Sequence, residues 1–288
     1  MLEKIDRILR LIEMDCKVRF IPSFVNRYNR WDSNIVLSNH CPFCGKWTEA
    51  LPVPNSSFRL IKNDYPFMSN QYTVFGKKHQ QFLSGEEIAS AVELVHRMSD
   101  CESGSLQILG SGASIPHHAH FSISNEKYPI NDLKREVIFD SEMYRISRIL
   151  GSPHLVVVIS GKVTHISKLT EQILKHFRYQ NLSYNILLTK KKEIFIIPRT
   201  QENSITLQRK VGVSLVGGIY PCYTPIKSRF INSDELLKEM FKHWERVSEL
   251  DLLSALQETT ISSEITNIRV MSLLGINTKM MIKKDTSN

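Results

Sequence analysis

The residues best suited to chemistry are three histidines that follow a short run of glycine and serine. From Gly110 to Ser122 the chain reads Gly-Ser-Gly-Ala-Ser-Ile-Pro-His-His-Ala-His-Phe-Ser. Backbone N–H groups of such a turn can hold a phosphate, and an imidazole can act as a nucleophile. His118 and His120 are two residues apart, so on a strand they share one face. The segment therefore indicates chemistry on phosphate groups.

His120 is the candidate nucleophile of this segment. An imidazole is nucleophilic at neutral pH when an acceptor, here expected to be a backbone carbonyl, holds the proton on its other nitrogen. The ring would attack an α-phosphorus to form a nucleotidyl-histidine, which a second phosphate or water would then resolve. The groups expected to hold phosphate oxygens are Gly110, Ser111, Gly112, Ser114 and the hydroxyl of Ser122. The same histidines could instead be a zinc cluster or a pair of core side chains.

A second cluster of reactive residues lies upstream, at Cys41-Pro-Phe-Cys44. Two cysteines at this spacing can bind one tetrahedral zinc ion, and no second Cys-x-x-Cys completes a four-cysteine site. The remaining ligands would be histidines or lone cysteines, and His79 and His118 are the leading candidates. A redox pair is the competing interpretation. A thioredoxin-like redox motif precedes a helix, however, whereas prolines and turns surround these two cysteines. A third alternative is that the two cysteines bind no metal ion and form no redox pair.

Size and composition are those of an ordinary globular protein. The 288 residues are 42% hydrophobic and 23% charged, and the formal net charge is +8. That charge favours an anionic partner such as a nucleotide. The longest aliphatic run, Leu155 to Ile159, is too short to span a bilayer. Five cysteines without a disulfide rhythm, and a start that lacks an apolar signal core, predict a cytoplasmic protein.

The pattern of apolar residues predicts both helices and strands. Residues 2–15 have helical spacing, and Ser84 with Glu87 forms a capping-box pattern that opens a helix to about Met98. Further helices are expected at 168–179 and 233–256. Strands are expected at 58–61, 71–75, 105–109, 118–124 and 154–160, with a hairpin of 183–189 and 193–198. This mixture predicts an α+β fold, with an antiparallel sheet and helices on one side.

Residues 112–122 resemble the active-site segment of the galactose-1-phosphate uridylyltransferase branch of the histidine-triad superfamily. Diadenosine tetraphosphate phosphorylases and GDP-galactose phosphorylases are in this branch. Three upstream pieces are also similar, in the same order: the Cys41-x-x-Cys44 knuckle, the turn Asn63-Asp-Tyr-Pro66 and the turn Gly76-Lys-Lys-His79. The hairpin of the second half is similar to that of the phosphorylases. The resemblance covers roughly residues 25–225.

This resemblance implies a histidine-triad-like fold of two diverged half-repeats, which we divide into residues 1–150 and 151–288. It implies a nucleotidyltransferase or phosphorylase with a structural zinc ion and a nucleotide or sugar-nucleotide substrate. Carried over by position, His120 is the nucleophile, and Asn63 and Asp64 form the nucleoside-binding turn. The implied zinc ligands are Cys41, Cys44, His79 and His118. His117 has no fixed counterpart.

One residue departs from the pattern of the branch. Ser122 stands where these enzymes usually have glutamine, and a serine reaches less far toward a phosphate oxygen. We nevertheless expect activity, because the turn and His120 are intact. Two rivals stay open: a hydrolase of nucleotide conjugates, and a non-catalytic zinc module that binds nucleic acid through its basic surface. Related enzymes are often dimers, so a homodimer is one option. Lys190 and Arg199 could face phosphate or lie on the surface.

Overall fold

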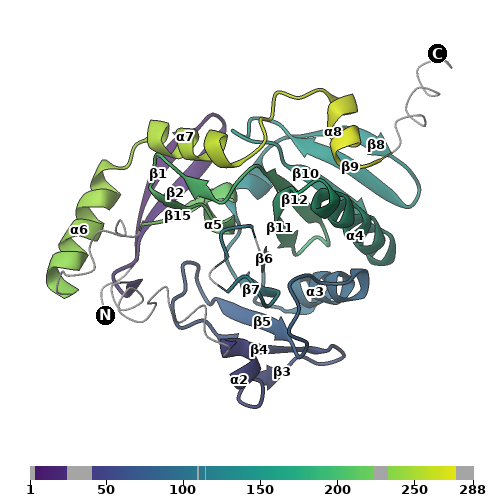
Figure 1. Ribbon diagram of the computed structural model, residues 1–288, viewed down its shortest axis with the longest axis horizontal. Helices are drawn as coiled ribbons and strands as arrows, with labels where there is room; N and C mark the ends of the chain where they lie inside the picture. Colours follow the sequence, from purple (N-terminus) through teal and green to yellow (C-terminus); the bar gives the residue numbers. More distant parts are fainter. Residues whose placement is uncertain (1–3, 25–40, 109, 114, 223–232, 277–288) are drawn as a thin grey trace.

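A ten-stranded antiparallel sheet forms the centre of the molecule (Figure 1). The computed structural model describes residues 4–24, 41–108, 110–113, 115–222 and 233–276. The strand order is β3-β4-β5-β7-β6-β11-β12-β10-β9-β8. The strands are β3 (Leu51–Pro52), β4 (Phe58–Lys62), β5 (Tyr72–Gly76), β6 (Ser103–Gln107), β7 (His120–Ser124), β8 (Arg135–Asp140), β9 (Tyr144–Ile149), β10 (Val157–Gly161), β11 (Ser183–Thr189) and β12 (Ile194–Arg199). The α+β class and the antiparallel sheet are confirmed.

The sheet consists of two halves with the same topology. Along the chain, β3-β4-β5-α3-β6-β7 is followed by β8-β9-β10-α4-β11-β12, where α3 is Gly85–Arg97 and α4 is Val163–Tyr179. The two sets of strands have the same order from edge to centre, and β6 pairs with β11 at the seam. The first half of the sheet therefore ends with β7, and the second half begins with β8. The division of the chain into residues 1–150 and 151–288 stays a prediction.

Helices α3 and α4 lie side by side against one face of the sheet (Figure 1). Their apolar faces, represented by Val92 and Ile173, pack with the sheet residue Phe121 in one core. The capping box that opens α3 is present. The Ser84 hydroxyl accepts from the Glu87 amide at 3.3 Å, and the Glu87 carboxylate accepts from the Ser84 amide at 2.8 Å.

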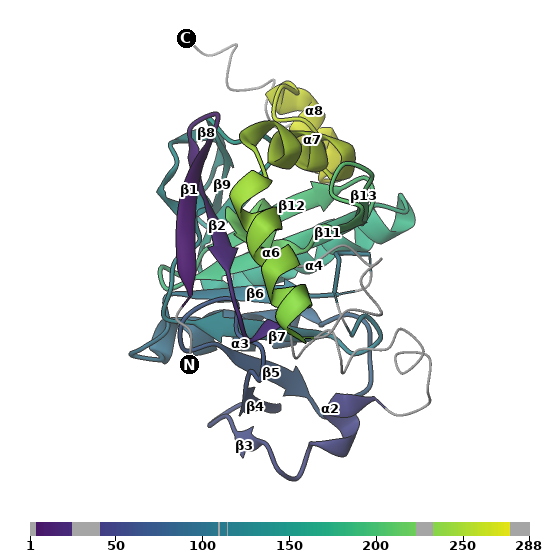
Figure 2. The same cartoon turned by 90° about the vertical axis from the view of Figure 1, so that its left-hand side faces the viewer.

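The other face of the second half is covered as well, so the helices do not all lie on one side. A small sheet of β1 (Ile5–Leu11), β2 (Met14–Phe20) and β15 (Ile219–Pro221) packs there with α5 (Val213–Val216) and α7 (Glu249–Thr259) (Figure 1 and, for β1, β2 and α7, Figure 2). The remaining described elements are α2 (Pro42–Gly45), the 3₁₀ helix η2 (Pro129–Asp132), β13 (Asn203–Ser204), β14 (Arg209–Lys210), α6 (Ser233–Arg246) and α8 (Asn267–Leu273).

Two predicted helices are wrong in these regions. Residues 2–15 form no helix where they are described, because 5–11 and 14–20 make a hairpin. Ile12 at its turn has a φ of 59°. The predicted helix 233–256 is two helices, α6 and α7, and the break follows from Ser248, whose hydroxyl caps α7 by accepting from the Asp251 amide at 3.2 Å.

None of the helices in the described ranges combines the length and the apolar character that crossing a bilayer requires.

Acid is expected to destabilise the fold through His154, whose side chain is fully buried. Burial, followed by the charge of Arg199, lowers the pKa of His154 from 6.5 to about 3. Below pH 6.5 the unfolded chain binds a proton at this residue and the folded chain does not. The free energy of unfolding therefore decreases as the pH is lowered. His154 alone should lower the free energy of unfolding by up to about 2 kcal/mol between pH 6.5 and 5.

Urea unfolding at several pH values between 5 and 7 checks this expectation. This window lies above the range in which carboxylates titrate. His154→Gln removes the titrating ring, so its unfolding free energy should vary less with pH than that of the unchanged protein. Identical pH dependence of the two proteins would contradict the assignment.

Candidate functional site

His120 begins β7, between β5 and β6, where it pairs with Phe75 and Gln107. Its side chain is 7% exposed. Its Nδ1 atom lies 2.8 Å from the carbonyl oxygen of His118. Because a carbonyl only accepts, Nδ1 carries the proton and the lone pair is on Nε2. Burial lowers the pKa of His120 to about 4, against the opposing effect of the hydrogen bond to His118. The ring is therefore neutral at pH 7.

His118 is held with the opposite tautomer. Its Nε2 atom donates to the carbonyl oxygen of Gly76 at 2.9 Å, so the lone pair is on Nδ1. That atom faces two sulfurs, at 3.2 Å from Sγ of Cys41 and 3.6 Å from Sγ of Cys44. Burial is the largest cause of a lowered pKa of His118, which keeps the ring neutral. The β5 carbonyl thus orients the imidazole as a metal ligand requires.

Four side chains meet at this point and could hold a metal ion. His79 joins Cys41, Cys44 and His118, with its Nδ1 atom 3.4 Å from Sγ of Cys44. All four candidate ligand atoms lie within 4.8 Å of one another. A tetrahedral zinc ion with ordinary bond lengths separates its ligand atoms by roughly 3.3–3.8 Å. The spacing and the two-thiol, two-imidazole set fit zinc.

The candidate ligands come from three segments of the chain. Cys41 and Cys44 belong to α2 and its N-cap, His79 follows β5, and His118 precedes β7. An ion held by all of them would join these segments next to His120.

Phe43, which sequence reasoning missed, connects the cysteine knuckle to both histidines. Its ring centroid lies 5.4 Å from that of His118 and 4.7 Å from that of His120. It also stacks on Phe75 of β5 at 4.8 Å. The available signal was an aromatic residue inside the Cys-x-x-Cys motif.

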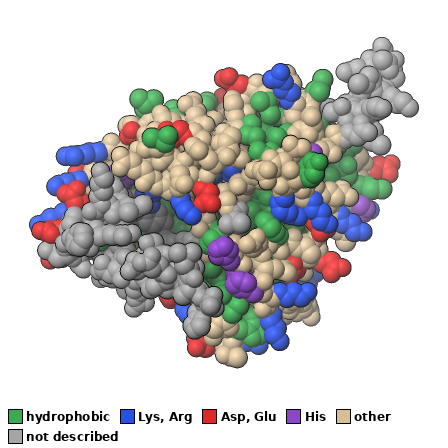
Figure 3. Space-filling model, in the orientation of Figure 1, with side chains coloured by type: hydrophobic (Ala, Val, Ile, Leu, Met, Phe, Trp, Pro, Cys, Tyr) green, Lys and Arg blue, Asp and Glu red, His purple; other side chains and the backbone are tan. Residues whose placement is uncertain are grey.

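Figure 3 shows histidine side chains gathered near the middle of one face, with hydrophobic side chains next to them.

The predicted nucleoside-binding turn lies on the loop after β4. The side-chain oxygen of Asn63 accepts from the backbone amide of Tyr65 at 2.9 Å, and the backbone amide of Asn63 donates to the Gln71 carbonyl at 3.0 Å. Asn63 therefore shapes the turn. The carboxylate of Asp64 is exposed and lies 3.8 Å from the ammonium of Lys46, which caps α2. This contact places the turn beside the cysteine knuckle.

The glycine-rich turn is more closed than expected. Gly110 and Gly112 have φ values of 79° and 76°, a backbone conformation that favours glycine. The hydroxyl of Ser111 donates to the Ile108 carbonyl at 2.6 Å, and its backbone amide points to the same oxygen. Ser111 thus closes the turn, and neither donor is available to phosphate in this conformation. Ser114 lies outside the described residues.

Ser122 lies on β7 with its neighbours Thr73 of β5 and Ser105 of β6. It is on the same face of the sheet as His120, because the two residues are separated by one position. Its side chain is 6% exposed. The predicted contact of its hydroxyl with phosphate stays a prediction.

The glycine turn packs directly against the second half of the chain. A Cβ atom on Gly112 would lie 2.5 Å from the carbonyl oxygen of Val211, and one on Gly110 would lie 2.1 Å from the hydroxyl of Ser183. We expect Gly112→Ala to lower the free energy of unfolding by about 2–4 kcal/mol, because it adds strain at positive φ to a backbone collision. Thermal unfolding measures the change.

Gly212→Ala is the matched control for this substitution. Gly212 lies on the other side of the same contact, and its Cβ would meet the Gly112 carbonyl at an ordinary 3.6 Å. The unfolding temperature of the Gly212→Ala variant should stay close to that of the unchanged protein. Equal effects of the two substitutions would show that the turn is not tightly packed.

Two cations of the second half are anchored rather than free in solvent. The ammonium of Lys190 donates to the carbonyl oxygens of Met98 and Ser99, just beyond α3. Arg199 is fully buried. Burial lowers the pKa of Arg199 to about 10. A surface position for Arg199 is therefore excluded.

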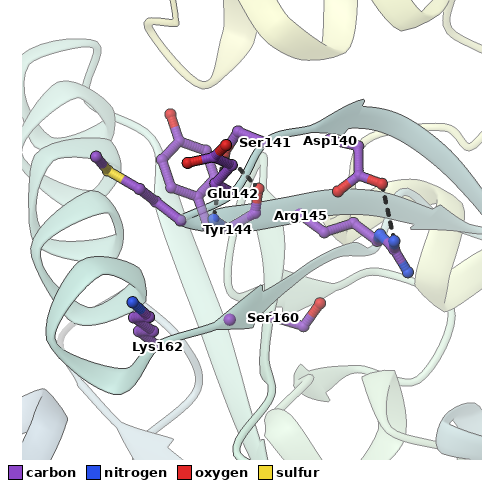
Figure 4. A pocket seen from close by; sticks show the side chains of 9 residues that line it. Asp140, Ser141, Glu142, Tyr144, Arg145, Ser160 and Lys162 are labelled. Carbon is purple, nitrogen blue, oxygen red and sulfur yellow. Dashed lines mark hydrogen bonds and ion pairs between the residues drawn. The ribbon is translucent and has the colours of Figure 1, made fainter.

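A shallow hollow lies elsewhere, between the β8–β9 turn and the start of α4 (Figure 4). Its volume is about 360 Å³, and its lining includes the ion pair of Arg145 and Asp140 at 2.8 Å. None of the candidate site residues lines it. Its open shape and paired charges indicate an ordinary surface depression.

Comparison with known proteins places this fold. No family model matches the sequence, and no curated protein matches it. The comparison with solved structures shows the fold, which is that of an Ap4A phosphorylase, as the sequence resemblance implied. The chain is similar to the crystal structure of yeast Ap4A phosphorylase Apa2 in complex with AMP. The TM-score is 0.58 at 15% identity, covering 92% of this chain and 91% of that chain.

The same yeast enzyme in complex with Ap4A gives a TM-score of 0.56 at 14% identity, with 90% of each chain covered. At this level of identity the likeness shows a common fold, and the chemistry has to be argued from the residues of this chain.

Proposed function

We propose that this chain is a nucleotidyltransferase or phosphorylase that acts through a nucleotidyl-His120 intermediate. The observation that supports it most is the state of His120: a neutral imidazole with Nδ1–H fixed by the His118 carbonyl and a lone pair on Nε2. The shared fold with Ap4A phosphorylase is consistent with this chemistry. The donor would be a nucleoside diphosphate-sugar, a dinucleoside polyphosphate or a nucleoside triphosphate.

In the first step the Nε2 lone pair of His120 attacks the α-phosphorus. The bond from phosphorus to the leaving oxygen breaks, and its electron pair goes to the leaving phosphate or sugar phosphate. The ring becomes cationic, and the carbonyl of His118 stabilises that charge through the Nδ1–H bond. In the second step an oxygen of phosphate or of a phosphorylated metabolite attacks, the P–N bond breaks, and the lone pair returns to Nε2.

The other residues would bind and orient the nucleotide. The amides at Gly110 and Gly112 and the hydroxyl of Ser122 are the proposed phosphate contacts, and Asn63 with Asp64 would meet the nucleoside. Cys41, Cys44, His79 and His118 would hold zinc, which supplies structural order at the start of β7. A cytoplasmic location and a homodimer remain predictions.

Covalent trapping tests the proposed function. Zinc-replete protein is incubated separately with α-³²P-labelled ATP, GTP, UTP and CTP, and with labelled UDP-glucose and Ap4A. The reactions are quenched in base, because a phosphoramidate bond survives alkali. The label should be found in the peptide that contains His120. Absence of an adduct with every donor would overturn the proposal.

Product analysis then separates a transferase from its nearest rival. If phosphate or a sugar phosphate is the acceptor, its addition should change the products from a nucleoside monophosphate to a diphosphate or a nucleotide sugar. Nucleoside monophosphate alone under every condition would identify a hydrolase.

A further inference from the structure

The buried cation Arg199 is held at the end of β12 by neutral oxygens. Its guanidinium donates to four groups, all of them carbonyl or amide oxygens. The acceptors are the carbonyl of Thr259 at 2.8 Å, the side-chain oxygen of Asn185 at 2.6 Å, the carbonyl of Val211 at 2.9 Å and the carbonyl of Gln201 at 2.9 Å. In the described part of the chain no carboxylate forms a hydrogen bond with this guanidinium, and Glu202 stabilises its charge only from a longer distance. A buried charge held in this way is a costly means of filling a core.

Asn185 transmits the position of Arg199 to the glycine turn. It is fully buried on β11, and its Nδ2 atom donates to the carbonyl oxygen of Ser111 at 3.0 Å. A guanidinium only donates, so it can face only the amide oxygen of Asn185. Arg199 thereby fixes which end of the amide points at the turn. Without it the amide could rotate and present an oxygen to the Ser111 carbonyl.

Arg199 supports the same turn by a second route. The Val211 carbonyl that it binds is the atom against which Gly112 packs. The loop that contains the turn starts beside Gln107 of β6 and ends at His120, and these two residues are paired. The two contacts therefore fix the loop on the side that faces the second half, next to the proposed nucleophile.

We propose that Arg199 and Asn185 of the second half are positioning residues that hold the glycine turn of the first half for nucleotidyl transfer at His120. In this role they act through the turn, and we assign them no contact with the nucleotide or the reacting atoms. This inference rests on the proposed function.

The test is the rate of labelling of His120 at saturating nucleotide, measured for Asn185→Ala and Arg199→Lys well below their unfolding temperatures. Because small displacements of a phosphate-binding turn weaken transition-state contacts, the rate should fall about 10- to 100-fold. Nucleotide affinity should change by less than about threefold. A purely structural role would lower the unfolding temperature and leave the rate of the folded fraction unchanged.

Arg135→Lys is the matched control. Arg135 forms an ion pair with Glu193, which precedes β12 and so lies at the opposite end of that strand from Arg199. Its labelling rate should equal that of the unchanged protein. A rate for folded Asn185→Ala within about twofold of normal would overturn the inference, because such a change is too small for a lost positioning contact.

Hydrogen exchange at residues 110–113 separates failure of the inference from failure of the proposed function. Asn185→Ala should speed exchange of these amides, whether or not the protein is labelled by any nucleotide. If the unchanged protein takes no label, the proposed function fails. If exchange is also unaltered in the variant, the positioning role fails independently.

Discussion

His120→Asn should lose covalent labelling by nucleotide, by a factor on the order of 10⁴ or more. Asparagine retains much of the size and polarity of the imidazole but has no nitrogen lone pair that can attack phosphorus. The measurement is the amount of base-stable ³²P bound per protein over time. Far-ultraviolet circular dichroism and the unfolding temperature establish that the variant is folded.

His117→Ala is the control for this substitution. His117 lies in the same segment, but its side chain is exposed, and we assign it no role. Its labelling rate should match that of the unchanged protein. Persistent labelling of His120→Asn, or loss of labelling in His117→Ala alone, would show that the nucleophile is a different residue.

Cys44→Ser should lose bound zinc and stability together. A hydroxyl is a far weaker zinc ligand than a thiolate, and a structural zinc ion contributes its binding free energy to folding. We expect the unfolding temperature to fall on the order of 10 °C. Labelling of His120 should fall as well, because His118, next to the nucleophile, would lose its anchor. Metal content by mass spectrometry and thermal unfolding are the measurements.

Cys101→Ala is the control for loss of a thiol. Cys101 is buried next to β6 and is not among the clustered ligands. This variant should keep one zinc ion per chain, whereas a chelator should lower the unfolding temperature of the unchanged protein as Cys44→Ser does. Full zinc content in Cys44→Ser would contradict the ligand set.

Local signals in the sequence predicted much of the sheet and its helices. The capping box at Ser84 and the hairpin of 183–189 and 193–198 correspond to α3, β11 and β12, because each depends on residues near one another in the chain. Residues 2–15 misled because Ile5, Ile8 and Ile12 have helical spacing, yet all three are exposed on the hairpin that forms there. The pairing of β2 with β15, more than two hundred residues later, is a tertiary contact that no local pattern encodes.

The candidate site was also predicted in part from the sequence, and the rest depends on tertiary contacts. The two cysteines and two histidines were named from spacing and resemblance, and the fold brings them together. The closed form of the turn at Ser111 was not predicted, because it depends on a single hydrogen bond from the Ser111 hydroxyl to the Ile108 carbonyl. Asn185 and Arg199 carried no signal as supports of that turn, because Asn185 contacts Ser111 of the other half of the chain and Arg199 acts on the turn only through Asn185 and Val211.

The seam between β6 and β11 makes the two halves interdependent. A fragment that ended before β8 would present β6 as a bare strand edge, with a row of unsatisfied backbone donors and acceptors. It would also lack Asn185, whose side chain donates to the Ser111 carbonyl in the glycine turn. Such a fragment should aggregate or self-associate rather than fold as a stable monomer, so a truncation between the two halves of the sheet is expected to abolish the native fold.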